Sequence, residues 1–176
     1  MFYSGISDEA GKSIDTQIKA HKELGWSHIE IRNVDGTNFT DIPYEKFDEC
    51  AAKLNDAKLK VSCFASQVAN WSRKITNPLS VDVEELERAV PRMKRLGTKF
   101  IRIMSYPNDD WKTDDWKAEC LKRIKRLTEI AEDGGIVLAH ENCSGWAGES
   151  PENTLEMLNA VNSEALQLIY DTGNPV

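Results

Sequence analysis

The sequence predicts an α/β fold in which helices wrap a parallel sheet, for three reasons. Strand patterns and helical patterns alternate strictly along the 176 residues, which is typical of a sheet built from strand–helix units. The segments after the predicted strands are long, whereas those before them are short glycine turns, so we expect the working face at the C-terminal ends of the strands. No linker or low-complexity stretch divides the chain, which predicts one domain over residues 1–176.

Six apolar runs bounded by turn-forming residues predict the strands. They cover residues 2–7, 28–32, 59–65, 100–104, 136–145 and 166–171. The run at 28–32 alternates polar and apolar residues. The run at 136–145 follows the Gly134–Gly135 turn and becomes polar toward its end, so we expect a buried strand that emerges into a loop.

Five stretches with apolar residues at helical spacing predict the helices between these strands. They cover residues 13–24, 44–57, 83–96, 115–133 and 151–161. The first of them places Ile14, Ile18 and Leu24 near one face, and Gly25 follows at the position where helices commonly stop. Pro151 fits the first turn of the last helix.

The composition excludes several classes of protein. The net charge is −7 and the pI is about 5.1, which argues against a nucleic-acid-binding or anionic-membrane-binding surface. No apolar run approaches the roughly 20 residues of a membrane span. The N-terminus lacks a basic region followed by an apolar core, so we see no signal peptide.

The four cysteines match no disulfide or zinc pattern, because none forms a CxxC pair. They are Cys50, Cys63, Cys120 and Cys143. We interpret them as small core hydrophobes, with Cys143 in a loop, and their use fits a reducing compartment and therefore a cytoplasmic location. His21, beside Lys22, is expected on the solvated surface.

Two carboxylates end consecutive predicted strands and form the main candidate site. Glu141 shares a strand face with Val137 and Ala139, and Asp171 shares one with Ile169. Neighbouring parallel strands would place the two carboxylates side by side, about 5 Å apart. Two like charges at that separation call for a shared proton or a metal ion.

Four segments give the chain a family resemblance. They are residues 5–11, 25–30, 140–142 and 171–174. On these segments the chain resembles the sugar phosphate isomerase/epimerase superfamily, the xylose isomerase-like TIM barrels, over its whole length. The resemblance implies a (β/α)8 barrel, of which about six units are present and strands seven and eight are absent. Because open edge strands promote aggregation, we expect a longer protein or a second chain, as in a homo-oligomer, to close the gap.

The resemblance also implies roles for the two carboxylates. Glu141 and Asp171 would be metal ligands, and Glu141 would be one of two acid/base carboxylates, whose partner lies on the missing strands. Oxygen ligands suit Mn²⁺ or Mg²⁺, and Zn²⁺ or Co²⁺ would fit if a His completed the set. Such a site would remove a proton α to the carbonyl of a small carbohydrate through an enediolate.

Further residues are candidates for substrate binding, each with a structural alternative. They are Glu30, Arg32, Arg102, Asn142, Trp146 and Asn174. Glu30, Arg32 and Arg102 could instead form an internal salt-bridge network, the two asparagines could stabilise turns, and Trp146 could pack its loop. His140 is expected on the opposite strand face from Glu141.

The first functional hypothesis is therefore a metal-dependent isomerase or epimerase of a sugar or keto-sugar. The second is a lyase or dehydratase of a keto-polyol or keto-glycoside, which would use the same proton abstraction and then lose a leaving group. A non-catalytic binding subunit is a third hypothesis. An endonuclease acting on abasic DNA is disfavoured by the acidic charge, and we expect neither a nucleic acid nor a membrane as partner.

Overall fold

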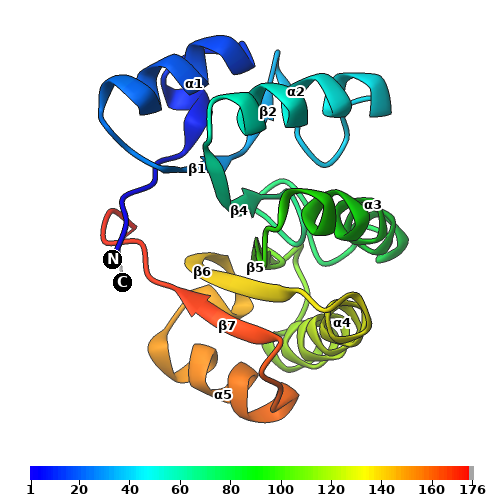
Figure 1. Cartoon of the computed structure of the whole chain (residues 1–176). Helices are drawn as coiled ribbons and strands as arrows, with labels where there is room; N and C mark the ends of the chain where they lie inside the picture. The colour runs from blue at the N-terminus through cyan, green and yellow to red at the C-terminus, as the bar shows by residue number, and fades with distance from the viewer. Residues whose placement is uncertain (175–176) are drawn as a thin grey trace.

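A curled parallel sheet with helices on its outside forms the molecule. The computed structural model describes residues 1–174. The sheet has the strand order β1-β4-β5-β6-β7, and all four pairings are parallel. Helices α1 to α5 lie on its convex side (Figure 1). The strands are β1 (His28–Ile31), β4 (Lys60–Ala65), β5 (Phe100–Ser105), β6 (Val137–Gly145) and β7 (Leu166–Ile169). The predicted α/β class and parallel sheet are confirmed.

All five predicted helices are present. They are α1 (Ile14–Glu23), α2 (Tyr44–Asp56), α3 (Ser80–Leu96), α4 (Thr113–Gly134) and α5 (Pro151–Val161). Gly97 and Gly135 cap α3 and α4 in the left-handed conformation, which glycine adopts without steric cost. Leu24 was expected on the buried face of α1 but is 61% exposed. The prediction is wrong because α1 ends at Glu23 and Leu24 already belongs to its cap.

The start of α5 depends on a serine cap that can be tested. The Ser150 Oγ accepts a hydrogen bond of 3.1 Å from the backbone N–H of Asn153. Ser150→Ala leaves that N–H without its partner and is expected to lower the free energy of unfolding by about 1 kcal/mol in urea denaturation. Ser80→Ala is the control, because Ser80 is exposed and its hydroxyl makes no hydrogen bond among residues 1–174. Equal losses in the two variants would contradict the capping role.

The expected first strand, 2–7, is not a strand. Only Ile6 forms a parallel bridge, to Glu30. Phe2 and Tyr3 are exposed and stack on His28 and Trp26 instead, with ring centroids 3.7 and 6.2 Å apart. The prediction is wrong because aromatic contacts, rather than a ladder of backbone hydrogen bonds, hold this segment.

A small hairpin follows β1 that the periodicity analysis missed. It consists of β2 (Asn33–Val34) and β3 (Thr37–Asn38), which pair antiparallel. Asp35 and Gly36 join them with φ of 52° and 84°, as a two-residue primed turn requires. Strands of two residues show no alternation, so only the Asp-Gly pair could have indicated the hairpin.

One hydrophobic core fills the space between the convex face of the sheet and the helices. The strand residues that point into it are fully buried, and they include Ile29, Ile31, Ile101, Ile103 and Leu138. The expected burial of Cys50, Cys63 and Cys120 is confirmed. Burial raises the pKa of Cys50 to about 11 and that of Cys120 to about 12, which makes these thiols poor nucleophiles.

His21 lies in the interior rather than on the surface. Its side chain is 4% exposed. Its Nδ1 is 2.9 Å from the Gln17 carbonyl oxygen and its Nε2 is 3.2 Å from the Gly5 carbonyl oxygen. The surface prediction is wrong because the N-terminal segment packs across this face of α1. Separately, no helix within residues 1–174 has the length and apolar character that crossing a membrane would require.

Candidate active site

Strand register places three charged side chains on the concave face of the sheet. Arg102 pairs with Ala65 and Ala139, and residues paired across parallel strands face the same side. Glu141 is two residues beyond Ala139 on that side. Glu30 pairs with Cys63, two residues before Ala65, and therefore faces the same interior. The register thus puts Glu30, Arg102 and Glu141 on one face of the sheet.

Arg102 and Glu141 form an ion pair at the centre of this face. The Arg102 Nε lies 3.1 Å from the Glu141 Oε2, and the two side chains are 13% and 8% exposed. The N–H does not point along this line, so neither atom has a hydrogen-bond partner within residues 1–174. The other carboxylate oxygen, Oε1, accepts a hydrogen bond of 3.1 Å from the Asn174 Nδ2. Glu141 therefore keeps one buried oxygen that is balanced by charge alone.

Asp171 reaches the same rim but is offset from Glu141 along the strand direction. Glu141 pairs with Ile169, the last residue of β7, and Asp171 follows two residues later. The expected level, side-by-side arrangement is therefore wrong, because β7 ends before its carboxylate. Asn142 fixes the backbone there: its Oδ1 accepts from the Asp171 N–H at 2.6 Å, and its Nδ2 donates to the Asp171 carbonyl at 3.0 Å. Asn142 thus has a structural role, because its side chain fixes the backbone of Asp171.

Glu30 is the least neutralised carboxylate of the group. Burial raises its pKa above the ordinary value of 4.5; the positive charges of Arg102 and Arg32 lower the pKa, and the negative charges of Glu141 and Asp171 raise it. Within residues 1–174 the Glu30 carboxylate forms no hydrogen bond or ion pair of its own. Burial without a hydrogen bond therefore favours the protonated form of Glu30.

Two of the expected substrate contacts have other partners. Arg32 donates from Nε to the Asp8 carboxylate at 2.9 and 3.1 Å, and from Nη2 to Glu9 at 2.6 Å. Its guanidinium is thus committed to the salt-bridge alternative. The Trp146 side chain is only 2% exposed, so the expectation of a substrate contact is wrong and the ring packs its loop instead. Trp71 and Trp111 are the exposed rim tryptophans, at 68% and 38%.

His140 lies on the convex side, as expected. It pairs with Ile103 and Leu168 and is 1% exposed. Burial lowers its pKa to about 4, and neither ring nitrogen has a hydrogen-bond partner within residues 1–174. The neutral ring lines an apolar pocket of about 290 Å³ between α5 and β7, away from the carboxylates.

The carboxylate oxygens at this rim are of the kind that a divalent cation binds, but the described residues supply too few of them. Glu141 offers a buried oxygen without a hydrogen bond, and Asp171 offers a second carboxylate at the same rim. Among the described residues, however, no three His, Cys, Asp or Glu side chains converge as a cation would require. Arg102 supplies positive charge to the same Glu141 oxygen. The pair therefore fits as part of an oxygen-rich ligand set that needs further donors.

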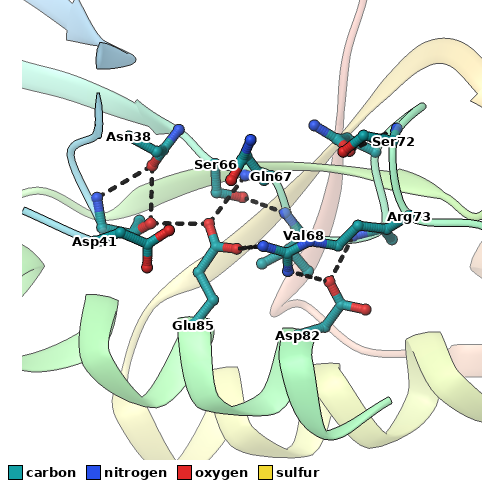
Figure 2. A network of polar contacts seen from close by, with 12 residues as sticks. Asn38, Asp41, Ser66, Gln67, Val68, Ser72, Arg73, Asp82 and Glu85 are labelled. Carbon is teal, nitrogen blue, oxygen red and sulfur yellow. Dashed lines mark hydrogen bonds and ion pairs between the residues drawn. The ribbon is translucent and has the colours of Figure 1, made fainter. Parts of the chain in front are cut away.

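A second buried ionic network, unforeseen from the sequence, supports the loop after β4 (Figure 2). Asp82 and Glu85 rise from α3 and are 1% and 0% exposed; Arg73 reaches both, with N–O distances of 2.6 and 2.5 Å. The Glu85 Oε1 also accepts from the Thr40 hydroxyl and the Gln67 N–H, each at 2.9 Å. The network thus joins α3, the segment after β3 and the loop at the rim. Its only sequence signal was two carboxylates three residues apart at the start of a helix.

Comparisons with known proteins identify the family of this fold. A family model described as xylose isomerase-like TIM barrel matches residues 18–176. A search of curated proteins finds no match. Among solved structures, 3-keto-D-glucoside 4-epimerase from E. coli aligns with a TM-score of 0.75 at 15% identity, covering 97% of this chain and 68% of that one.

Two further structures are similar to a comparable degree. A probable 3-DHS dehydratase from Bacillus anthracis aligns with a TM-score of 0.74 at 19% identity, with 97% of this chain and 63% of that chain covered. A xylose isomerase-like TIM barrel protein from Mycobacterium smegmatis, in complex with magnesium, gives 0.69 at 16%, with 96% and 61% covered. At these identities the likeness concerns the fold, and this chain spans roughly two thirds of the length of each structure.

Proposed function

Because the chain belongs to the xylose isomerase-like TIM barrel family, we propose that it takes part in isomerising or epimerising a sugar or keto-sugar, with Glu141 as an acid/base group. The observation that supports this most is the surrounding of Glu141. One of its oxygens is held by Asn174, and the other is buried beside Arg102 without a hydrogen bond. A carboxylate oxygen in that state is available to take a proton from carbon.

Several residues of this chain have separate roles in the proposed reaction. Arg102 places a positive charge beside the Glu141 Oε2, and Asn174 fixes the direction of the carboxylate by donating to its Oε1. Asn142 holds the backbone of Asp171, and Glu141 and Asp171 would supply two oxygen ligands for Mn²⁺ or Mg²⁺. When bound, such a cation polarises the substrate carbonyl and makes the α-proton more acidic. Zn²⁺ or Co²⁺ would require a histidine ligand in addition.

The second candidate is a lyase or dehydratase acting on a keto-polyol or keto-glycoside. The similar fold of a probable dehydratase supports it, and the first step, removal of the α-proton, is the same. The two reactions differ in the product, because isomerisation conserves the mass of the substrate whereas elimination does not. Mass spectrometry of the product therefore separates them.

The metal part of the proposal is tested by titrating Mn²⁺ into the protein and following its electron paramagnetic resonance signal. Glu141→Gln and Asp171→Asn are each expected to weaken Mn²⁺ binding by more than about 10-fold, because each removes a charged ligand. Glu45→Gln is the control, since Glu45 is exposed on α2. Equal Mn²⁺ affinity in all four proteins would exclude these ligands. Wild-type protein that binds no Mn²⁺ and no sugar would favour the non-catalytic hypothesis.

A further inference from the structure

We propose that Glu85 is a positioning residue for the candidate active site: it fixes the segment after β4, and this segment fixes the strand that carries Arg102. The inference rests on the proposed function, because it concerns the same site. Glu85 is fully buried on α3, and its carboxylate contacts Thr40, Gln67 and Arg73 rather than a residue of the site. Its influence on the site therefore passes through the backbone of the rim.

Side chains take the place of a neighbouring strand beside the segment after β4. The ladder between β1 and β4 ends where Ile31 pairs with Phe64. Beyond that pair, three backbone groups bond to side chains instead: the Ala65 carbonyl to the Asn38 Nδ2 at 3.1 Å, the Gln67 N–H to the Glu85 Oε1 at 2.9 Å, and the Ala69 N–H to the Asp82 Oδ1 at 3.0 Å. Both carboxylates point from α3 toward this segment (Figure 2). They thus supply the acceptors that a further strand would supply.

The same segment is bonded to β5 on its other side. Three hydrogen bonds join the two: from the Ser66 hydroxyl to the Arg102 carbonyl at 2.6 Å, from the Met104 N–H to the Val68 carbonyl at 3.2 Å, and from the Tyr106 N–H to the Ala69 carbonyl at 3.0 Å. These bonds hold the chain at Arg102 and beyond it. The Arg102 side chain in turn lies beside Glu141 on the concave face, so the segment links α3 to the site.

Two residues in these contacts have a strained backbone. Ala69 and Tyr106 are fully buried and have φ of 54° and 56°, in the left-handed region that costs a non-glycine residue about 1 kcal/mol or more. Such conformations persist only where the surroundings impose them. Here Asp82 holds the Ala69 N–H, and the Ala69 carbonyl holds Tyr106. A rim kept in one costly conformation suits a site in which Arg102 must meet its partner at a fixed distance.

The position of Arg102 can be measured through Glu30. Arg102 lowers the pKa of Glu30, and the size of this effect depends on the distance between the two charges. Loosening β5 would let the guanidinium spend more time away from the interior. Moving a unit charge from roughly 6 to 7 Å changes a pKa by about 0.3 at an effective dielectric constant near 20. The pKa of Glu30 therefore measures the position of Arg102 without any substrate.

The test is a ¹³C NMR titration of the Glu30 carboxyl in the whole protein. Glu85→Met removes the acceptor of the Gln67 N–H, and Ser66→Ala removes the bond to the Arg102 carbonyl. Each variant is expected to raise the pKa of Glu30 by at least about 0.3. Glu85→Gln is the matched control, because its amide oxygen can still accept from the Gln67 N–H. It should keep the pKa of Glu30 within about 0.1 of wild type, although it too loses the ion pair of Glu85.

Each outcome decides a separate point. An unchanged pKa of Glu30 in folded Glu85→Met or in Ser66→Ala breaks one of the two links and overturns the positioning role. An equal rise in Glu85→Gln and Glu85→Met also overturns it, because the lost charge would then be the cause. Ser66→Ala leaves the ion pairs intact, so it decides the matter even if Glu85→Met does not fold. The proposed function fails separately, if wild-type protein with MnCl2 places no deuterium in a ketohexose in D2O.

Discussion

Arg73→Met is expected to lower the free energy of unfolding by about 3–5 kcal/mol, the usual cost of removing one partner from a buried ion pair. Arg73 is the only cation in contact with Asp82 and Glu85 among residues 1–174, and those carboxylates are 1% and 0% exposed. Without Arg73 two negative charges remain in the interior, held only by hydrogen bonds from neutral donors. Urea denaturation followed by circular dichroism measures the effect.

The matched control for this variant is Arg126→Met. Arg126 pairs with Glu129 on the surface of α4, and both side chains are about half exposed, so the change should stay within about 0.5 kcal/mol. If Arg73→Met cost no more than Arg126→Met, the network of Figure 2 would not contribute to stability.

Arg102→Met is expected to give the second large loss, about 3 kcal/mol at neutral pH, and the loss should shrink as the pH falls. Arg102 pairs with Glu141 and lowers the pKa of Glu30. Without it, the pKa of Glu30 rises further, because burial and the charges of Glu141 and Asp171 are then opposed by Arg32 alone. The variant can relieve the repulsion by taking up protons, which acidic solution supplies.

The direction of this pH dependence follows from linkage. The pKa of Glu30 is already raised in the folded protein, so its contribution to stability is complete below its unfolded pKa and is lost as the pH rises through the folded pKa. In Arg102→Met this loss grows. The difference in unfolding free energy between wild type and variant should therefore increase from pH 4 toward pH 7. A difference that is constant over this range, or that is largest at pH 4, would contradict the shared cluster.

Most of the fold could be predicted because its elements are long and periodic. The five helices and the strands from β1 to β7 in the sheet carry apolar residues at regular spacing, and tertiary packing agrees with that pattern. The predictions that were wrong concern residues whose positions are set by individual contacts rather than by a periodic pattern. Phe2 and Tyr3 have strand-like character but stack on rings. His21 is polar, yet it lies in the interior, where its two ring nitrogens are within hydrogen-bond distance of the backbone carbonyls of Gln17 and Gly5.

The sequence indicated which residues to consider for the site, but not the partners that they have in the fold. Strand-end positions identified Glu141, Asp171 and Asn174, and strand alternation put Glu30 and Arg102 on the interior face. Sequence could not show that Arg32 is taken by Asp8 and Glu9, because those partners lie far away in the chain. Nor could it show how far β7 extends, which sets the offset of Asp171 from Glu141.

The imbalance of charge on the concave face bears on what can bind there. Glu30, Glu141 and Asp171 share this interior with Arg102, and Arg32 is already neutralised by its own two carboxylates. Even with Glu30 protonated, the charges described on this face sum to a negative value, which attracts cations and repels anions. Under the proposed function, this charge would favour uncharged polyols and ketoses over sugar phosphates.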